Sequence, residues 1–67
     1  MSPAEIAAIR QLLALRRARK IAGLWCNAGV LRVELLDGHK LHAQEPRGYA
    51  RVLASVELWI AERKAAA

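Results

Sequence analysis

The sequence predicts an α+β fold: a helix, a three-stranded antiparallel meander and a second helix, with both helices on one face of the sheet. Two segments, near the beginning and the end of the chain, carry apolar residues at the spacing of a helix. Between them lie short runs of strand character, separated by Asn27-Ala28-Gly29 and Asp37-Gly38, which are typical turn sequences. Two helices covering one side of a small sheet would bury the apolar faces of all these elements.

The first helix has a clear N-terminal signal. Ser2 is suited to the N-cap, Pro3 to the first helical position, and Glu5 completes a capping box. The helix is expected to reach about Arg19 or Lys20. The large aliphatic residues expected to face the core are Ile6, Ile9, Leu12 and Leu13.

The central segment is expected to form strands at residues 21–26, 30–36 and 40–44. In the first hairpin, either Trp25 or the pair Leu24 and Cys26 faces inward, and the pattern leaves both alternatives open. Val30 and Leu36 are expected on the sheet face away from the helices, where apolar groups suggest a contact surface.

A three-residue loop, Asp37-Gly38-His39, is predicted for the second hairpin. A two-residue loop would mix polar and apolar groups on each face, whereas one buried face normally fixes the register of a strand pair. The predicted cross-strand pairs are Leu35–Leu41, Val33–Ala43, Arg32–Gln44 and Glu34–His42.

The second helix is expected to open near Pro46, and the chain to fray from about Lys64. Its apolar residues form one continuous stripe, which predicts a helix face packed on the core. The residues of this stripe are Tyr49, Val52, Leu53, Val56, Trp59 and Ile60.

The chain has 67 residues and is expected to be a single small domain, residues 1–67. Cys26 is the only cysteine, so neither disulfides nor a zinc-finger spacing can supplement the core. No secretory signal and no apolar run long enough to span a bilayer is recognisable, which favours a cytoplasmic protein that does not act on membranes. The composition, rich in alanine, leucine and arginine, suggests a bacterial or phage origin.

Catalysis is disfavoured by the few reactive side chains and their positions. Asp37 and His39 flank a turn glycine, where burial cannot tune either group. Cys26 reads as a small apolar strand residue, because no basic partner is obvious. His39 and His42 are three residues apart, so strand geometry points them to opposite faces and opposes a metal site. We expect no enzyme activity, cofactor, metal or small-molecule substrate.

The chain is strongly basic, with 11 Lys+Arg against 6 Asp+Glu and a net charge of +5. Such proteins commonly bind nucleic acid, anionic membranes or acidic proteins. Because both amphipathic helices are needed for the core, a membrane-surface helix is disfavoured. Nucleic acid or an acidic protein is the expected partner.

Four cations, which we call the basic cluster, end the first helix: Arg16, Arg17, Arg19 and Lys20. On a helical wheel they fall on nearly the same side as the large aliphatic residues, so the helix either overhangs its core or ends near Leu15. Cations are also favourable at a helix C-terminus. We expect the basic cluster, together with Arg47 and Arg51, to contact phosphates.

The polar face of the second hairpin is the candidate for base contacts. A two-stranded ribbon fits the major groove of DNA, where arginine and glutamine read base edges. Trp25 is the one aromatic residue available for stacking, because Tyr49 and Trp59 lie on the apolar stripe, and this disfavours a protein that stacks on single strands. The residues expected on this polar face are Arg32, Lys40, His42 and Gln44.

Small residues line a second side of the first helix, and we call them the alanine stripe. They would allow another helix to approach closely, as in a homodimer, although alanine also fills exposed helix faces simply because it favours helix. The alanine stripe contains Ala4, Ala7, Gln11, Ala14 and Ala18.

The segment Glu5-Ile6-Ala7-Ala8-Ile9-Arg10, followed by Gly29 and Arg32-Val33-Glu34, resembles the small lambda-type head–tail joining proteins. The resemblance covers the first half of the chain, implies a helix, a hairpin and a helix, and departs from that family at the strand after Asp37. The order of elements is also that of double-stranded-RNA-binding domains. That family is set aside, because residues 46–51 lack its lysine-rich helix start and the loops are short.

The sequence therefore predicts a small, non-catalytic basic protein of bacterial or phage origin that associates with nucleic acid, with a homodimer as a candidate state. The alternative is a protein-interaction module that binds an acidic partner, such as a phage or mobile-element inhibitor or a structural adaptor of the head–tail joining type.

Overall fold

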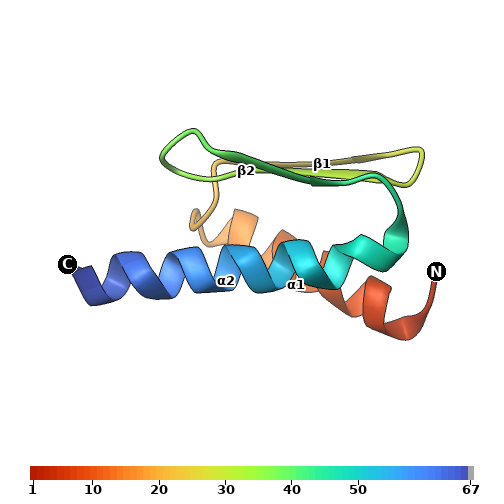
Figure 1. Cartoon of the computed structure of the whole chain (residues 1–67), viewed down its shortest axis with the longest axis horizontal. Helices are drawn as coiled ribbons and strands as arrows, with labels where there is room; N and C mark the ends of the chain where they lie inside the picture. Colours follow the sequence, from red (N-terminus) through yellow and green to blue (C-terminus); the bar gives the residue numbers. More distant parts are fainter. Residues whose placement is uncertain (67) are drawn as a thin grey trace.

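The computed structural model describes residues 1–66 and has the predicted order of elements (Figure 1). Its elements are α1 (Pro3–Arg17), β1 (Gly23–Asn27), β2 (Val30–Glu34), β3 (Lys40–Ala43), the 3₁₀ helix η1 (Pro46–Gly48) and α2 (Tyr49–Ala66). The strands form one antiparallel sheet in the order β1-β2-β3. Both helices lie against the same face of this sheet, as Figure 1 shows, so the predicted α+β topology is confirmed.

The N-terminus of α1 is held by the predicted capping box. The backbone N–H of Glu5 donates to Oγ of Ser2 at 3.4 Å, and the backbone N–H of Ser2 donates to Oε2 of Glu5 at 2.8 Å. Pro3 occupies the first turn, where its missing N–H costs no hydrogen bond. The residues before and inside the first turn therefore define where α1 begins.

The C-terminus of α1 is a Schellman motif, which ends the helix at Arg17. The N–H of Lys20 donates to the carbonyl oxygen of Leu15 at 2.9 Å, and that of Arg19 donates to Arg16 at 3.1 Å. Arg19 has a φ of 59°, in the left-handed region that glycine normally occupies at this position. The helix thus stops before Arg19 and Lys20, and the chain turns toward β1.

The core side of α1 differs from the prediction. Ala8 and Leu12 are buried, whereas Ile6 and Leu13, both expected in the core, are 38% and 40% exposed. Ile9 is half-buried as well. The reason is that α1 packs against both α2 and the sheet, so the small Ala8 occupies the crowded position. The helix is therefore rotated so that Leu12 stays in the core and Ile6 and Leu13 face solvent.

The first hairpin resolves the alternative left open by the sequence. Asn27 pairs with Val30 across a two-residue turn, and both turn residues, Ala28 and Gly29, have positive φ values of 52° and 81°. Positive φ at both positions is the requirement of a type I′ turn, whose twist matches that of the strands. This register directs Leu24 and Cys26 toward the helices.

The register of the second hairpin differs by two residues from the prediction. The loop has three residues, as expected, but they are Leu36-Asp37-Gly38, closed by the N–H of Leu35 donating to the carbonyl of His39 at 2.8 Å. Gly38, with a φ of 93°, takes the left-handed position that ends such loops. The observed pairs are Leu31–Ala43, Val33–Leu41, Arg32–His42 and Glu34–Lys40.

A shift of two residues leaves every side chain on its predicted face, because strand side chains alternate with a period of two. Leu41 and Ala43 therefore still face the helices, while Arg32, His42 and Gln44 still belong to the opposite face. The predicted faces are confirmed, and the predicted partners on those faces are corrected.

The apolar stripe of α2 is confirmed as the centre of the core. Tyr49, Val52, Leu53 and Val56 are buried, and Trp59 and Ile60 pack against them. The helix extends to Ala66, and alanine is the best helix former. Ala67 lies outside the described residues.

Candidate nucleic-acid interface

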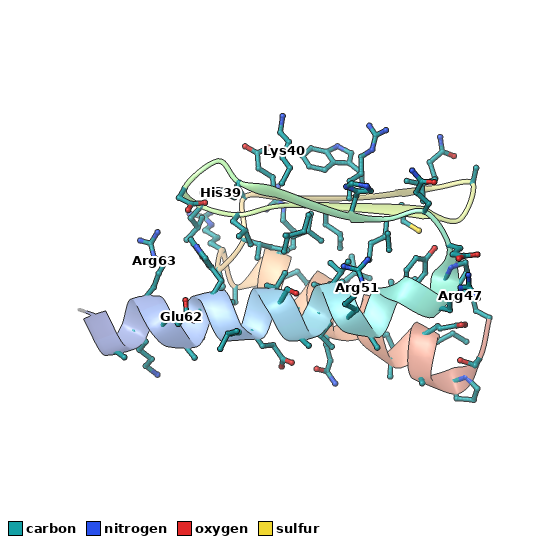
Figure 2. All side chains as sticks on the ribbon, viewed as in Figure 1. His39, Lys40, Arg47, Arg51, Glu62 and Arg63 are labelled. Carbon is teal, nitrogen blue, oxygen red and sulfur yellow. The ribbon has the colours of Figure 1, made fainter. Side chains whose placement is uncertain are left out.

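One face of the sheet carries no helix, and we call it the open face. Figure 2 shows side chains projecting from it away from α1 and α2, with Lys40 among them. The open face is shallowly hollowed along the strands. Side chains that line this hollow include Trp25, Val30, Arg32, Lys40, His42 and Gln44.

Three planar side chains form a row across the strands of the open face. Trp25 in β1 pairs with Arg32 in β2, and Arg32 pairs with His42 in β3. All three are exposed. The neighbouring row consists of Gly23, Glu34 and Lys40 in the same strand order. The open face therefore combines an aromatic ring, a guanidinium and an imidazole in one line.

The indole of Trp25 lies directly on Gly23, its neighbour two residues earlier on the same face. A Cβ atom on Gly23 would overlap Cη2 of Trp25 and lie 2.7 Å from Cζ3, a separation that real Cβ atoms essentially never show. Gly23 is buried under the ring, whereas Trp25 itself is 54% exposed. Glycine at this position thus leaves the space that the six-membered ring of Trp25 occupies.

The basic cluster lies at the end of the sheet where β1 begins. Arg16 and Arg17 form the last turn of α1, and Arg19 and Lys20 belong to the connection that leads into Gly23; all four are exposed. Because α1 ends at Arg17, the helical wheel does not apply to Arg19 and Lys20, and the structure lies nearer to the alternative of an early helix end than to that of a longer, overhanging helix.

Lys40 lies at the same end of the sheet as the basic cluster, because it pairs with Glu34, which pairs with the first residue of β1. Arg32 continues the positive charge toward the middle of the open face. Across residues 1–66, no cation of the basic cluster forms a salt bridge, and neither do Arg32 and Lys40. These cations are therefore free to contact phosphates or carboxylates.

Arg47 and Arg51 are not brought together with the basic cluster. Both follow the far end of β3, and Figure 2 shows Arg47 at the end of the molecule opposite His39, with Arg51 between them. Nε of Arg47 donates to Oε1 of Glu45 at 2.6 Å, and a guanidinium N–H of Arg51 donates to the carbonyl of His42 at 3.5 Å. The structure thus divides the predicted phosphate contacts between two ends of the molecule.

Asp37 and His39 form a hydrogen-bonded pair at the tip of the second hairpin. Oδ1 of Asp37 accepts from the backbone N–H of His39 at 3.0 Å, and Oδ2 lies 2.8 Å from Nδ1 of its imidazole. The backbone N–H, and then the imidazole, hold the pKa of Asp37 below its ordinary value. Nearby, the guanidinium of Arg63 lies 4.7 Å from the ring centre of Trp59, in a cation–π contact.

Cys26 lies beside the phenol of Tyr49, with Sγ 3.7 Å from Oη. Burial, and secondarily this thiol, raise the pKa of Tyr49. The phenol O–H is committed to the carbonyl oxygen of Gly29, to which it donates at 2.5 Å. This contact joins α2 to the first hairpin and contains no basic group that would activate the thiol.

The remaining candidate contact residues, which carry no charge, do not lie on one common surface. Val30 is half-buried on the open face, while Leu36, which is 51% exposed, lies in the β2–β3 loop and not on the sheet. The alanine stripe is exposed along α1 at all of its positions: Ala4, Ala7, Gln11, Ala14 and Ala18. Within residues 1–66, no three His, Cys, Asp or Glu side chains converge in the manner of a metal site.

Gly23 is the residue of the open face that sequence reasoning missed. A glycine two residues before a tryptophan in the same strand is the signal that marks the seat of the ring. His42 was recognised on the polar face, but its place beside Arg32 depends on the corrected register.

Comparison with known proteins identifies no relative: no protein-family model matches the chain, and no curated protein or solved structure is significantly similar to it. Over the described residues, neither α1 nor α2 combines the length and the apolar character that crossing a membrane requires.

Proposed function

We propose that this chain is a non-enzymatic nucleic-acid-binding protein of bacterial or phage origin, and that it acts in the cytoplasm. The observation that carries the proposal is that the basic cluster and Lys40 lie at the same end of the sheet, and that neither they nor Arg32 on the open face form a salt bridge within residues 1–66. Most of the free energy of non-specific nucleic-acid binding comes from such cations, which displace counterions from phosphates.

The arrangement of acidic residues supports this assignment. Glu45 is already paired with Arg47, and Asp37 is paired with His39 at the hairpin tip. Glu34, the carboxylate that remains on the open face, lies between Gly23 and Lys40. One carboxylate beside a lysine reduces the local positive field but leaves Arg32 and the basic cluster free for phosphates.

The test is a fluorescence-anisotropy titration of labelled DNA and RNA against the protein over a range of salt concentrations. Binding is expected to weaken steeply with salt, and the double variant Arg16→Gln/Arg17→Gln is expected to reduce the salt slope by about two, one for each lost phosphate contact. The absence of binding at micromolar protein and low salt would refute the proposal.

Arg47→Gln/Arg51→Gln is the matched control, because it removes the same charge from the far end of β3. Arg16 and Arg17 belong to the basic cluster, whose cations form no salt bridge within residues 1–66. Arg47 contacts Glu45, and Arg51 contacts a backbone carbonyl. The control is expected to change the salt slope less. Equal effects would show that net charge alone, and no particular surface, governs binding.

The outer side of α1 supports a second candidate function, the binding of an acidic protein. Ile6 and Leu13 are two turns apart and exposed, and Arg10 and Arg17 lie between and after them on the same side. A shallow hollow beside Ile6 is bordered by Pro3, Ala7, Arg10 and Gln11. An acidic amphipathic helix would complement this surface.

Light scattering separates the second candidate from a homodimer formed through the alanine stripe, which lies on a neighbouring side of α1. A dimer formed along the alanine stripe is expected to dissociate on substitution of Ala14 by glutamate, whereas an acidic partner leaves the free chain monomeric. A monomer that binds no acidic helix would remove α1 from consideration as an interface.

A further inference from the structure

We propose that the open face binds single-stranded nucleic acid, with an unstacked base lying on the indole of Trp25. This inference rests on the proposed function and narrows it to one class of nucleic acid. It starts from the row of Trp25, Arg32 and His42, whose members come from three different strands.

The contact between Trp25 and Gly23 is the first argument. Large apolar side chains on a sheet surface normally pack against neighbours, but this indole lies on a glycine and is 54% exposed. The outer atoms of its six-membered ring thus lie against Gly23, while more than half of the residue is open to solvent. A ring that rests on the sheet and remains exposed in this way is available for stacking on a base.

The neighbours of Trp25 are the second argument. A single free aromatic residue disfavours stacking, but guanidinium and imidazole groups also stack on bases, and the structure places both beside the indole. Adjacent strands are about 4.8 Å apart, so the row spans about 10 Å. That length accommodates two or three unstacked bases on Trp25, Arg32 and His42.

The accessibility of the base faces is the third argument, because it distinguishes a single strand from a duplex. Arg32, the side chain best suited to reading base edges, lies in the central strand, and the indole and the imidazole lie on either side of it. In a duplex the faces of the bases are hidden in the stack, so the indole would have no surface to contact.

The charges fit a strand that enters from one end of the sheet. The basic cluster and Lys40 lie at the end where β1 begins, and Gln44 follows β3 at the other end. Phosphates are attracted to the first end, and the bases then reach the row beyond it. Glu34, which lies between Gly23 and Lys40, disfavours phosphates directly above the second row.

The experiment follows the emission of Trp25 during titration with a short oligothymidine and with a duplex of the same length. The chain also contains Trp59, so the measurement is made on the Trp59→Phe variant, in which Trp25 is the only tryptophan. Stacking is expected to quench the emission on addition of the single strand, with little change on addition of the duplex.

Two substitutions, at Trp25 and at Gly23, test the stacking site itself. Trp25→Ala is expected to weaken single-strand binding on the order of tenfold and to leave the affinity for duplex unchanged. Gly23→Ala keeps the indole but displaces it, and is expected to weaken single-strand binding in the same direction. Leu58→Ala, at an exposed residue of α2 outside the open face, is the control, and circular dichroism verifies that each variant is folded.

The outcomes separate this inference from the proposed function. Tight binding to both nucleic acids, with no quenching and no effect of Trp25→Ala, would overturn the stacking site and leave general nucleic-acid binding intact. The absence of binding to either nucleic acid would overturn both. Quenching by the single strand, together with a selective loss of single-strand affinity in the Trp25 and Gly23 variants, would support the stacking site.

Discussion

The phenol of Tyr49, at the first residue of α2, donates a hydrogen bond of 2.5 Å to the carbonyl oxygen of Gly29 in the β1–β2 turn. These residues are twenty positions apart in the chain, and Tyr49 is 1% exposed. The bond therefore fixes the position of α2 relative to the first hairpin and with it the orientation of the open face.

Tyr49→Phe is expected to destabilise the fold. The variant retains the ring in the core but leaves the carbonyl of Gly29 without this donor, which is expected to shift the unfolding equilibrium by a factor of about five to ten. Urea denaturation measures the change. Leu58→Ala, at a residue that is 60% exposed, serves as the control and should alter stability little. A Tyr49→Phe variant as stable as the parent would show that the bond contributes nothing.

Stability is expected to fall at alkaline pH because of the same residue. Burial raises the pKa of Tyr49 above its ordinary value of 10.0, so the unfolded chain loses this proton before the folded chain does. The contribution of the neutral phenol is thus complete below pH 10 and is lost as the pH rises through the folded pKa. Urea midpoints across this range, compared with those of Tyr49→Phe, isolate the effect, since the phenylalanine variant lacks the titrating group.

Arg19→Gly is expected to stabilise the protein. Arg19 is held at a φ of 59° by the Schellman motif, and a residue with a side chain is disfavoured there by about 1 kcal/mol relative to glycine. Thermal or urea unfolding measures the gain. Ala18→Gly, one position earlier at a φ of −78°, is the opposite control and is expected to destabilise, because glycine has no advantage there. Destabilisation by Arg19→Gly would contradict the assigned role of the motif.

Leu12 and Leu13 are adjacent leucines with opposite predicted sensitivities. Leu12 is 0% exposed and Leu13 is 40% exposed. Leu12→Ala is expected to cost about 2–5 kcal/mol, enough to unfold much of so small a domain, whereas Leu13→Ala is expected to cost less than about 1 kcal/mol. The two variants control for each other in composition and helix propensity. Similar losses of stability, measured by urea denaturation, would contradict the observed rotation of α1.

The sequence alone predicted the order of the elements and the faces of the residues in β2 and β3, because both depend on periodicity; it left open which residues of the first strand face inward. The stripe from Tyr49 to Ile60 and the alternation in Val30–Glu34 each have one arrangement that buries the apolar side. The rotation of α1 was not predictable in this way. It depends on Ala8, whose small side chain gains its core position from the close approach of another helix and not from hydrophobicity.

The cross-strand pairs of the second hairpin could also not be predicted from the alternation of apolar and polar residues. Registers that differ by two residues bury the same face, so Val33–Ala43 and the observed Val33–Leu41 satisfy the same alternation. The choice between them is made by Gly38, which takes the left-handed position at the end of the loop. The row on the open face depends on this local choice, since it brings His42 beside Arg32.

The carboxyl group of Asp37 is expected to titrate below 3.8, its ordinary value, in the folded chain. The backbone N–H of His39 is the main cause and its imidazole the second, since both stabilise the carboxylate. The stabilising contribution of Asp37 is therefore complete above pH 3.8 and is lost as the pH falls through the folded pKa.

An NMR titration of the Asp37 carboxyl carbon measures this shift, with the urea-unfolded chain as the reference. His39→Ala removes the imidazole but keeps the backbone N–H, so the midpoint is expected to move only part of the way toward the unfolded value. Coincident midpoints in the folded and unfolded chains would show that the hairpin tip is not closed in solution. Since the same loop sets the register that aligns Arg32 with His42, that result would also weaken the row on which single-strand binding depends.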